Sequence, residues 1–142
     1  MPTYEASISI AAPRESVWPV LSDVVAWPDW LPTVTRVQPL QGRSLEVGSR
    51  YTVTQPRLRP ATWVVTDLLP PRRFTWQARS PGLLMVAEHS VEETSPTTSR
   101  VLLRFSFAGL LGVPVGWVFR SVTESYLTQE AAALQRKVEG KA

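Results

Sequence analysis

Apolar and polar positions alternate along most of the middle of the chain, with the period of two that is typical of β-strands. In residues 73–78, for example, Phe74, Trp76 and Ala78 alternate with polar side chains. Proline, glycine and serine separate successive stretches of this kind. The pattern predicts seven strands, at residues 3–10, 33–40, 47–55, 61–69, 73–78, 83–93 and 99–107. Because the connections after residue 33 are too short to hold a crossover helix, we predict an antiparallel sheet.

Two other regions carry the three- and four-residue spacing of apolar positions that is typical of helices. The first, residues 14–24, follows Pro13, which suits the start of a helix, and a second short helical turn is predicted over residues 25–32. Pro19 lies inside the first region, where a proline costs about 3 kcal/mol, so we predict a short or kinked helix. Residues 117–138 contain no glycine or proline and predict a long helix.

The order strand, two short helices, six strands and long helix predicts an α+β fold. A sheet with one apolar face has to cover that face, and the long helix, about 30 Å in length, is the only element able to do so. A curved sheet touches a single helix along a line and leaves space beside it. We therefore predict one domain, residues 1–142, with an internal apolar pocket of the kind that binds small molecules.

Composition removes several classes of function. The chain has no cysteine and a single histidine, His89, which excludes disulfides, thiolate sites and metal sites with two imidazole ligands. It has no GxSxG turn, and residues 109–116 (GLLGVPVG) lack the Lys-Ser/Thr pair of a phosphate loop. We expect neither a metal nor a cofactor.

The charge pattern also limits the partners. The net charge is +3, and the arginines are scattered along the chain, which does not favour a nucleic-acid surface. The N-terminus has no basic segment followed by an apolar one, and no apolar run reaches the ~18 residues of a membrane helix. We expect a cytoplasmic monomer or homodimer without stable membrane insertion, whose partner is a small hydrophobic molecule.

Five segments span nearly the whole chain and carry a shared pattern. They are residues 10–32 (IAAPRESVWPVLSDVVAWPDWLP), 47–53 (VGSRYTV), 63–77 (WVVTDLLPPRRFTWQ), 80–93 (SPG with EHSVEE) and 125–135 (SYLTQEAAALQ). In this order they resemble the START-like superfamily, which has the helix-grip fold, and within it the polyketide cyclase/dehydrase-type branch. The resemblance implies a curved seven-stranded antiparallel sheet wrapped around the long C-terminal helix, with a hydrophobic cavity between them. It does not imply one reaction, because the superfamily includes carriers, receptors and cyclases.

His89 shares one face of its predicted strand with Met85, Ala87 and Val91, and this face should point inward. Three roles fit an inward histidine. It could hydrogen-bond a carbonyl or hydroxyl group of a ligand, it could act as a general acid or base, or it could be a core residue with one polar partner. We favour the first role.

The other candidates lie on the same inward faces, where each could contact a ligand or only fill the core. Aromatic side chains could stack on a ring of the ligand, and polar ones could place a hydroxyl or amide group in the cavity. We predict as ligand-contacting residues Tyr51, Gln55, Trp63, Phe74, Trp76, Met85, His89, Phe105, Val122 and Tyr126. His89 and Tyr126 are also the candidates for catalysis. Glu130 is predicted to face solvent, because an inward carboxylate is costly unless it is paired.

Two functions stay open from the sequence. The first is binding of a small lipid-like, aromatic or polycyclic ligand in the internal cavity. The alternative is a polyketide cyclase/dehydrase-like enzyme in which polar cavity residues, such as His89, Tyr126 and Gln55, transfer protons. The enzyme requires inward ionisable groups, and the sequence predicts few of them. A third function, binding of a protein partner without a working cavity, has the least support.

Overall fold

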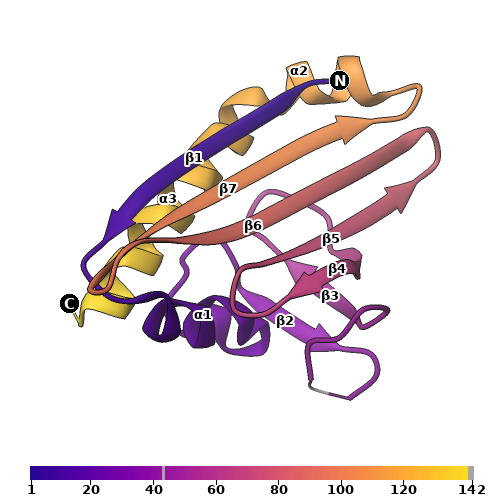
Figure 1. The fold of residues 1–142 in the computed structure, drawn as a ribbon. Coiled ribbons are helices and arrows are strands. Elements are labelled where there is room, and N and C mark those ends of the chain that lie inside the picture. The colour runs from indigo at the N-terminus through magenta and orange to yellow at the C-terminus, as the bar shows by residue number, and fades with distance from the viewer. Residues whose placement is uncertain (43, 141–142) are drawn as a thin grey trace.

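A computed structural model describes residues 1–42 and 44–140. Seven strands form one antiparallel sheet, in the order β1-β7-β6-β5-β4-β3-β2, that curves around a long helix (Figure 1). The strands are β1 (Thr3–Ile10), β2 (Arg36–Pro39), β3 (Arg50–Thr54), β4 (Ala61–Leu69), β5 (Arg73–Ser80), β6 (Leu83–Ser95) and β7 (Thr98–Ala108). The predicted α+β helix-grip fold is confirmed.

The helical segments are α1 (Arg14–Ser22), the 3-10 turn η1 (Val24–Asp29), α2 (Gly112–Val118) and α3 (Arg120–Glu139). The two short helices predicted after the first strand are α1 and η1. The prediction of one long helix starting at Trp117 is wrong at its start, because a separate short helix, α2, comes before α3. Pro114 occupies the first turn of α2, where its missing N–H group is not needed. Gly116 lies so close to Pro2 that a Cβ would approach that ring to 2.7 Å.

The two halves of α3 meet the sheet differently. In its C-terminal half, Ala131, Ala133 and Leu134 are buried in the main core cluster. Small alanine side chains let the helix approach the strands closely there. In its N-terminal half, Val122 and Tyr126 are only half-buried, and the side chains face the space described below.

The antiparallel order places the connections at two opposite ends of the sheet (Figure 1). One end carries the N-terminus, the β3–β4 loop (55–60), the β5–β6 turn (81–82) and α2, and is called the α2 end. The other carries α1, η1, the β4–β5 turn (70–72) and the β6–β7 turn (96–97), and is called the α1 end. Among the described residues, none of the helices has both the length and the apolar character to span a lipid bilayer.

Candidate functional site

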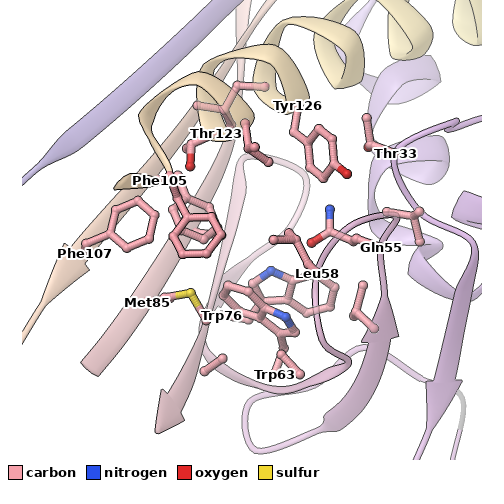
Figure 2. Close-up of a pocket in the computed structure, with 18 of the residues that line it drawn as sticks. Thr33, Gln55, Leu58, Trp63, Trp76, Met85, Phe105, Phe107, Thr123 and Tyr126 are labelled. Carbon is pink, nitrogen blue, oxygen red and sulfur yellow. The ribbon is translucent and has the colours of Figure 1, made fainter. Parts of the chain in front are cut away.

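A cavity of about 760 Å³ lies between the inner face of the sheet and the N-terminal half of α3. Its volume is within the range of small-molecule pockets. Figure 2 shows the aromatic rings of Trp63, Trp76 and Phe105 on one side, and Gln55 and Tyr126 on the other. The cavity therefore offers a mainly apolar surface with a small number of hydrogen-bonding groups.

The aromatic side of the cavity is made of rings that brace one another. The ring centroid of Trp63 lies 5.7 Å from that of Trp76 on the next strand and 5.7 Å from that of Phe105. Trp27 of η1 contacts Trp76 at 5.4 Å, and its indole N–H donates a hydrogen bond to the carbonyl of Leu21 at 3.0 Å. Because each ring is held by its neighbours, the aromatic surface is already formed without a ligand.

Two polar side chains reach the cavity from the side of α3 and the β3–β4 loop. The Tyr126 hydroxyl donates a hydrogen bond to the carbonyl of Pro56, which ties α3 to this loop. The hydroxyl proton is thereby engaged, so toward a ligand Tyr126 presents its oxygen lone pairs. The Gln55 amide makes no hydrogen bond to any other described side chain or backbone group and is free for one to a ligand.

His89 lines the cavity and is buried, with only 4% of its surface exposed. Its ring stacks on Phe74 with centroids 4.2 Å apart, and its Nδ1 lies 3.4 Å from the Phe74 carbonyl oxygen. Because a carbonyl can only accept, the proton belongs on Nδ1 and Nε2 keeps a free lone pair. Burial lowers the pKa of His89 to about 4, so the imidazole is neutral at neutral pH.

Glu130 of α3 faces this histidine. Its Oε1 lies 4.0 Å from the His89 Nε2, and its side chain is 13% exposed. Burial raises the pKa of the Glu130 carboxyl to about 8, so the group is protonated at neutral pH. The prediction that Glu130 faces solvent is wrong. Its place one turn beyond Tyr126 was the signal for an inward position, and protonation removes the cost of burying a charge.

The His89–Glu130 pair thus combines a neutral imidazole lone pair with a protonated carboxyl group. The two atoms are too far apart for a direct hydrogen bond, and both residues line the cavity. An oxygen atom of a ligand placed beside them can accept a proton from Glu130 or donate one to His89. An acid and a base therefore face each other in a buried part of the cavity wall.

The structure places most of the predicted ligand-contacting residues around this cavity. Those in its wall are Gln55, Trp63, Trp76, Met85, His89, Phe105, Val122 and Tyr126. Tyr51 and Phe74 point inward but lie outside the wall, because inward positions near the α1 end are filled. Tyr51 is fully buried and donates to the Ser44 carbonyl at 3.2 Å, and Phe74 packs edge-on against Trp18. That any of these residues contacts a ligand stays a prediction.

Sequence reasoning missed several residues of the wall besides Glu130. Leu58 belongs to a loop, where periodicity gives no signal about direction. Thr33 was predicted as the first residue of a strand, but β2 begins only at Arg36, and Thr33 lies in the connection before it. Phe107 and Thr123 continue the inward faces of β7 and α3, so the patterns of these elements did contain them. In residues 1–42 and 44–140, no three His, Asp or Glu side chains come together as the ligands of a metal would.

Solved structures share this fold at low sequence identity. The Zhui aromatase/cyclase from Streptomyces sp. R1128 is 19% identical, with a TM-score of 0.79 over 96% of this chain and 93% of that one. A START superfamily protein from Mycobacterium smegmatis is 18% identical, with a TM-score of 0.77 over 97% of each chain. Norcoclaurine synthase from Thalictrum flavum, solved with dopamine and hydroxybenzaldehyde, is 15% identical, with a TM-score of 0.77 over 99% of this chain and 87% of that one.

These identities establish the fold alone, and no curated protein sequence matches the chain significantly. A family model gives the more specific result. The model described as polyketide cyclase/dehydrase and lipid transport matches residues 1–139, which is nearly the entire chain. The resemblance seen in the sequence is confirmed, and the hydrophobic cavity between sheet and helix agrees with it. The chain belongs to the polyketide cyclase/dehydrase and lipid transport family and has its START-like fold.

Proposed function

We propose that the protein binds a small apolar molecule, aromatic, polycyclic or lipid-like, that carries an oxygen atom at the His89–Glu130 pair. The cavity carries this proposal, because about 760 Å³ of space stays open beside a wall of preformed aromatic rings. A flat ring system stacked on Trp63 and Trp76 would gain roughly 0.5–1.5 kcal/mol per ring contact beyond the burial of its surface.

The His89–Glu130 pair would make the cavity select ligands that carry an oxygen atom. The free lone pair of His89 and the carboxyl of Glu130 lie in apolar surroundings, where an unpartnered polar group is costly. A ligand hydroxyl satisfies both groups, because it accepts from the Glu130 carboxyl and donates to His89 Nε2. A ligand carbonyl satisfies Glu130 alone, and a pure hydrocarbon satisfies neither. Discrimination of this kind is stronger than that between two apolar ligands differing in size.

Thermal unfolding with 2-naphthol and with naphthalene tests this proposal. We expect the Tm to rise with 2-naphthol concentration and to rise less with naphthalene. The substitution Val122→Trp places a large side chain in the cavity and should abolish the effect, whereas Val86→Trp on the outer face of β6 should preserve it. A Tm that does not respond to either compound contradicts the proposal.

The His89–Glu130 pair favours a second candidate function, proton transfer in a polyketide cyclase/dehydrase-like reaction. In an aldol ring closure, His89 Nε2 would take a proton from the carbon next to a ketone. Glu130 would give its proton to the oxygen of the carbonyl under attack, so that a C–C bond forms and a hydroxyl results. The imidazolium would then return a proton to the Glu130 carboxylate. Two of the structural neighbours are an aromatase/cyclase and a synthase, which supports this candidate.

Turnover of a linear poly-β-keto thioester, followed by mass spectrometry of cyclised products, tests the second candidate. We expect activity with the wild type and a loss of at least about a hundredfold in His89→Ala and in Glu130→Gln. Ser90→Ala, next to His89 on the outer face of β6, is the matched control. If 2-naphthol binds but His89→Ala turns over as fast as the wild type, binding is the function and proton transfer is not.

We further propose that residues 1–142 act as one domain in the cytoplasm, as a monomer or homodimer with a small molecule and no nucleic acid as partner. The buried core supports one domain, since it joins residues of β1, of the middle strands and of α3. The scattered arginines support the absence of a nucleic-acid partner.

A further inference from the structure

The α2 end exposes an unusual group of apolar side chains. Leu110, Trp117 and Val118 are 94%, 73% and 77% exposed. We call the whole group the α2 patch; it consists of Leu110, Leu111, Val113, Trp117, Val118 and Phe119. Soluble proteins rarely gather so many large apolar residues on one part of the surface, and where they do the patch usually binds something.

The α2 patch is held in place by backbone contacts. The Leu111 N–H donates to the Gly82 carbonyl of the β5–β6 turn at 2.7 Å. Gly112 and Gly116 lie against the Phe107 carbonyl and Pro2, where a Cβ at either glycine would come within 2.7 Å. The short helix is therefore fixed to three neighbouring segments, and its apolar side chains are presented outward in a defined position.

The cavity opens beside this patch. Its wall residues that are exposed mark the opening, and they lie in the β3–β4 loop, at the start of β4, at the end of β5 and just before α3. We call these residues the mouth; they are Arg57, Arg59, Pro60, Thr62, Arg79, Ser80 and Phe119. Phe119 belongs both to the mouth and to the α2 patch, and Val115 of α2 lines the cavity from inside.

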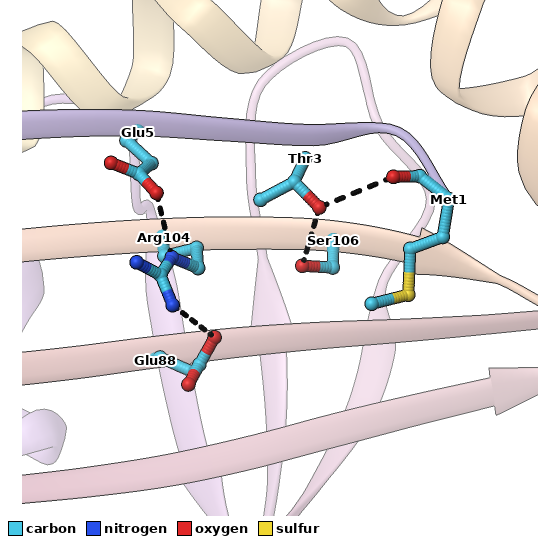
Figure 3. A network of polar contacts seen from close by, with 6 residues as sticks. All are labelled: Met1, Thr3, Glu5, Glu88, Arg104 and Ser106. Atoms are coloured by element: carbon cyan, nitrogen blue, oxygen red, sulfur yellow. Dashed lines mark hydrogen bonds and ion pairs between the residues drawn. The ribbon is translucent and has the colours of Figure 1, made fainter.

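The mouth is also cationic. Arg57, Arg59 and Arg79 are exposed, and none of them forms an ion pair with a carboxylate in the described part of the chain. Residues 94–123, which include the α2 patch, contain no acidic residue. By contrast, Arg104 on the outer face of the sheet is shared between Glu5 and Glu88, at 2.8 and 3.8 Å (Figure 3).

We propose that the α2 end docks on an anionic lipid bilayer, with the α2 patch in the boundary between headgroups and acyl chains and the three mouth arginines on the headgroups. Short helices with exposed Trp and aliphatic residues, flanked by cations, have this arrangement at membrane surfaces. The mouth then faces the lipid. Binding to the bilayer needs no ligand in the cavity, so the proposal goes beyond the proposed function.

Two other occupants fit the surface less well. A second copy related by a two-fold axis would bring the arginines of one mouth close to those of the other, which is unfavourable. An acidic protein would match the arginines, but it would need an apolar groove as well to cover Leu110, Trp117 and Val118. An anionic bilayer supplies the charge and the apolar surface together.

Flotation of the full chain with vesicles tests the proposal. We expect binding to vesicles of phosphatidylcholine with phosphatidylglycerol at ~0.1 M salt, less binding to phosphatidylcholine alone, and less at ~1 M salt. The double variant L110S/W117S should bind at least about tenfold more weakly. Its matched control, V47S/L69S, loses two exposed apolar side chains at the α1 end and should bind as the wild type does.

A second pair of variants tests the charges. The triple variant R57Q/R59Q/R79Q should weaken binding to the anionic vesicles by about a hundredfold and remove most of its salt dependence. R50Q/R72Q/R100Q makes the same change in net charge at exposed positions away from the mouth and should bind far better than the first triple variant. Far-UV circular dichroism and the Tm confirm that each variant is folded.

Three results would overturn the proposal. The first is a wild type that does not float with either vesicle. The second is vesicle binding that L110S/W117S leaves unchanged while R57Q/R59Q/R79Q removes it, because only the charges would then contact the headgroups and the α2 patch would not enter the bilayer. The third is a wild type that elutes as a dimer without binding vesicles and becomes a monomer in L110S/W117S, because the patch would then be covered by a second copy.

Discussion

The α1 end and the α2 end of the sheet carry the same kind of inward-facing side chain with opposite results. Near the α1 end, Phe74 is fully buried between the ring of His89 and that of Trp18 on α1. Toward the α2 end, Trp63 and Phe105 face the cavity. Phe74, Trp63 and Phe105 lie on one face of one continuous sheet, so alternation along the strands does not distinguish a filled region from an open one.

The difference comes from the elements that cover the sheet. At the α1 end, α1 and η1 add a second layer beside α3, and Trp27 of η1 packs against Phe74 and Trp76 of the sheet. At the α2 end, only the first turns of α3 and the short α2 lie over the strands. The cavity therefore follows from incomplete cover, and the His89–Glu130 pair lies where the covered region meets the open one.

The largest expected loss of stability comes from replacing one aromatic residue at each end of the sheet. Phe74→Ala leaves a hole in a filled region and should lower the free energy of unfolding by about 3–5 kcal/mol. Phe105→Ala only widens a cavity that already exists and should cost about half as much or less. Urea denaturation of both variants at pH 7 measures the two losses. Equal losses would mean that the space beside Phe105 is not open in solution.

The sequence predicts the inward-facing side chains and an internal pocket, but it does not predict which of these side chains line the pocket and which are packed in the core. Alternation in β5 and β6 placed Trp76 and His89 on the inner face, and the order of elements predicted an internal pocket. The same reasoning put Tyr51 and Phe74 in the pocket wall, because periodicity does not tell which part of a face α1 and η1 cover. Contacts across elements decide this, and a single sequence carries little information about them.

Glu130 and α2 were missed for two different physical reasons. Periodicity did place Glu130 on the inner side of α3, but the usual cost of burying a carboxylate argued against it. The shifted pKa removes that cost, since the group is buried as a neutral acid. The α2 segment has two glycines and a proline, which suggest a loop by propensity. Its contacts with Pro2, Phe107 and Gly82 stabilise a helix there instead.

The next largest predicted change in stability comes from Glu130, which lies where the filled region meets the open one. Because burial raises the pKa of Glu130 to about 8 from a usual 4.5, the folded state keeps a proton that the unfolded state has lost between these pH values. Stability of the wild type should therefore fall, relative to Glu130→Gln, as the pH rises through this window. Between pH 6 and 7.5 the relative loss should be about 2 kcal/mol, measured by urea denaturation. A constant difference between the two proteins would contradict the shift.

His89 should show the opposite dependence on pH. Burial lowers its pKa to about 4 from a usual 6.5, so between these values the unfolded state binds a proton that the folded state does not. The wild type should thus lose stability as the pH falls, relative to His89→Gln, by about 1 kcal/mol between pH 5.5 and 4.5. The same denaturation series, extended to acid, measures this. If the two curves stay parallel, the imidazole is already solvated and the boundary region is open to water.

The smallest predicted change in stability comes from the hydrogen bond that joins α3 to the β3–β4 loop beside the cavity. The Tyr126 hydroxyl donates to the Pro56 carbonyl and joins α3 to the β3–β4 loop, where strand pairing no longer holds the chain. Tyr126→Phe keeps the ring and removes the hydrogen bond, so the free energy of unfolding should fall by only about 1 kcal/mol.

The local consequence of Tyr126→Phe should be clearer than the global one. Amide hydrogen exchange in residues 55–60 should become faster, while exchange in β6 and β7 should change only as the global stability does. Tyr4→Phe is the matched control, because the Tyr4 hydroxyl donates to the Gly116 carbonyl and joins β1 to α2 instead. If both variants accelerate exchange equally in residues 55–60, the loop is not held by Tyr126. Selective acceleration in Tyr126→Phe would show that a single hydrogen bond secures this side of the cavity, a role that layered aromatic packing fills at the α1 end.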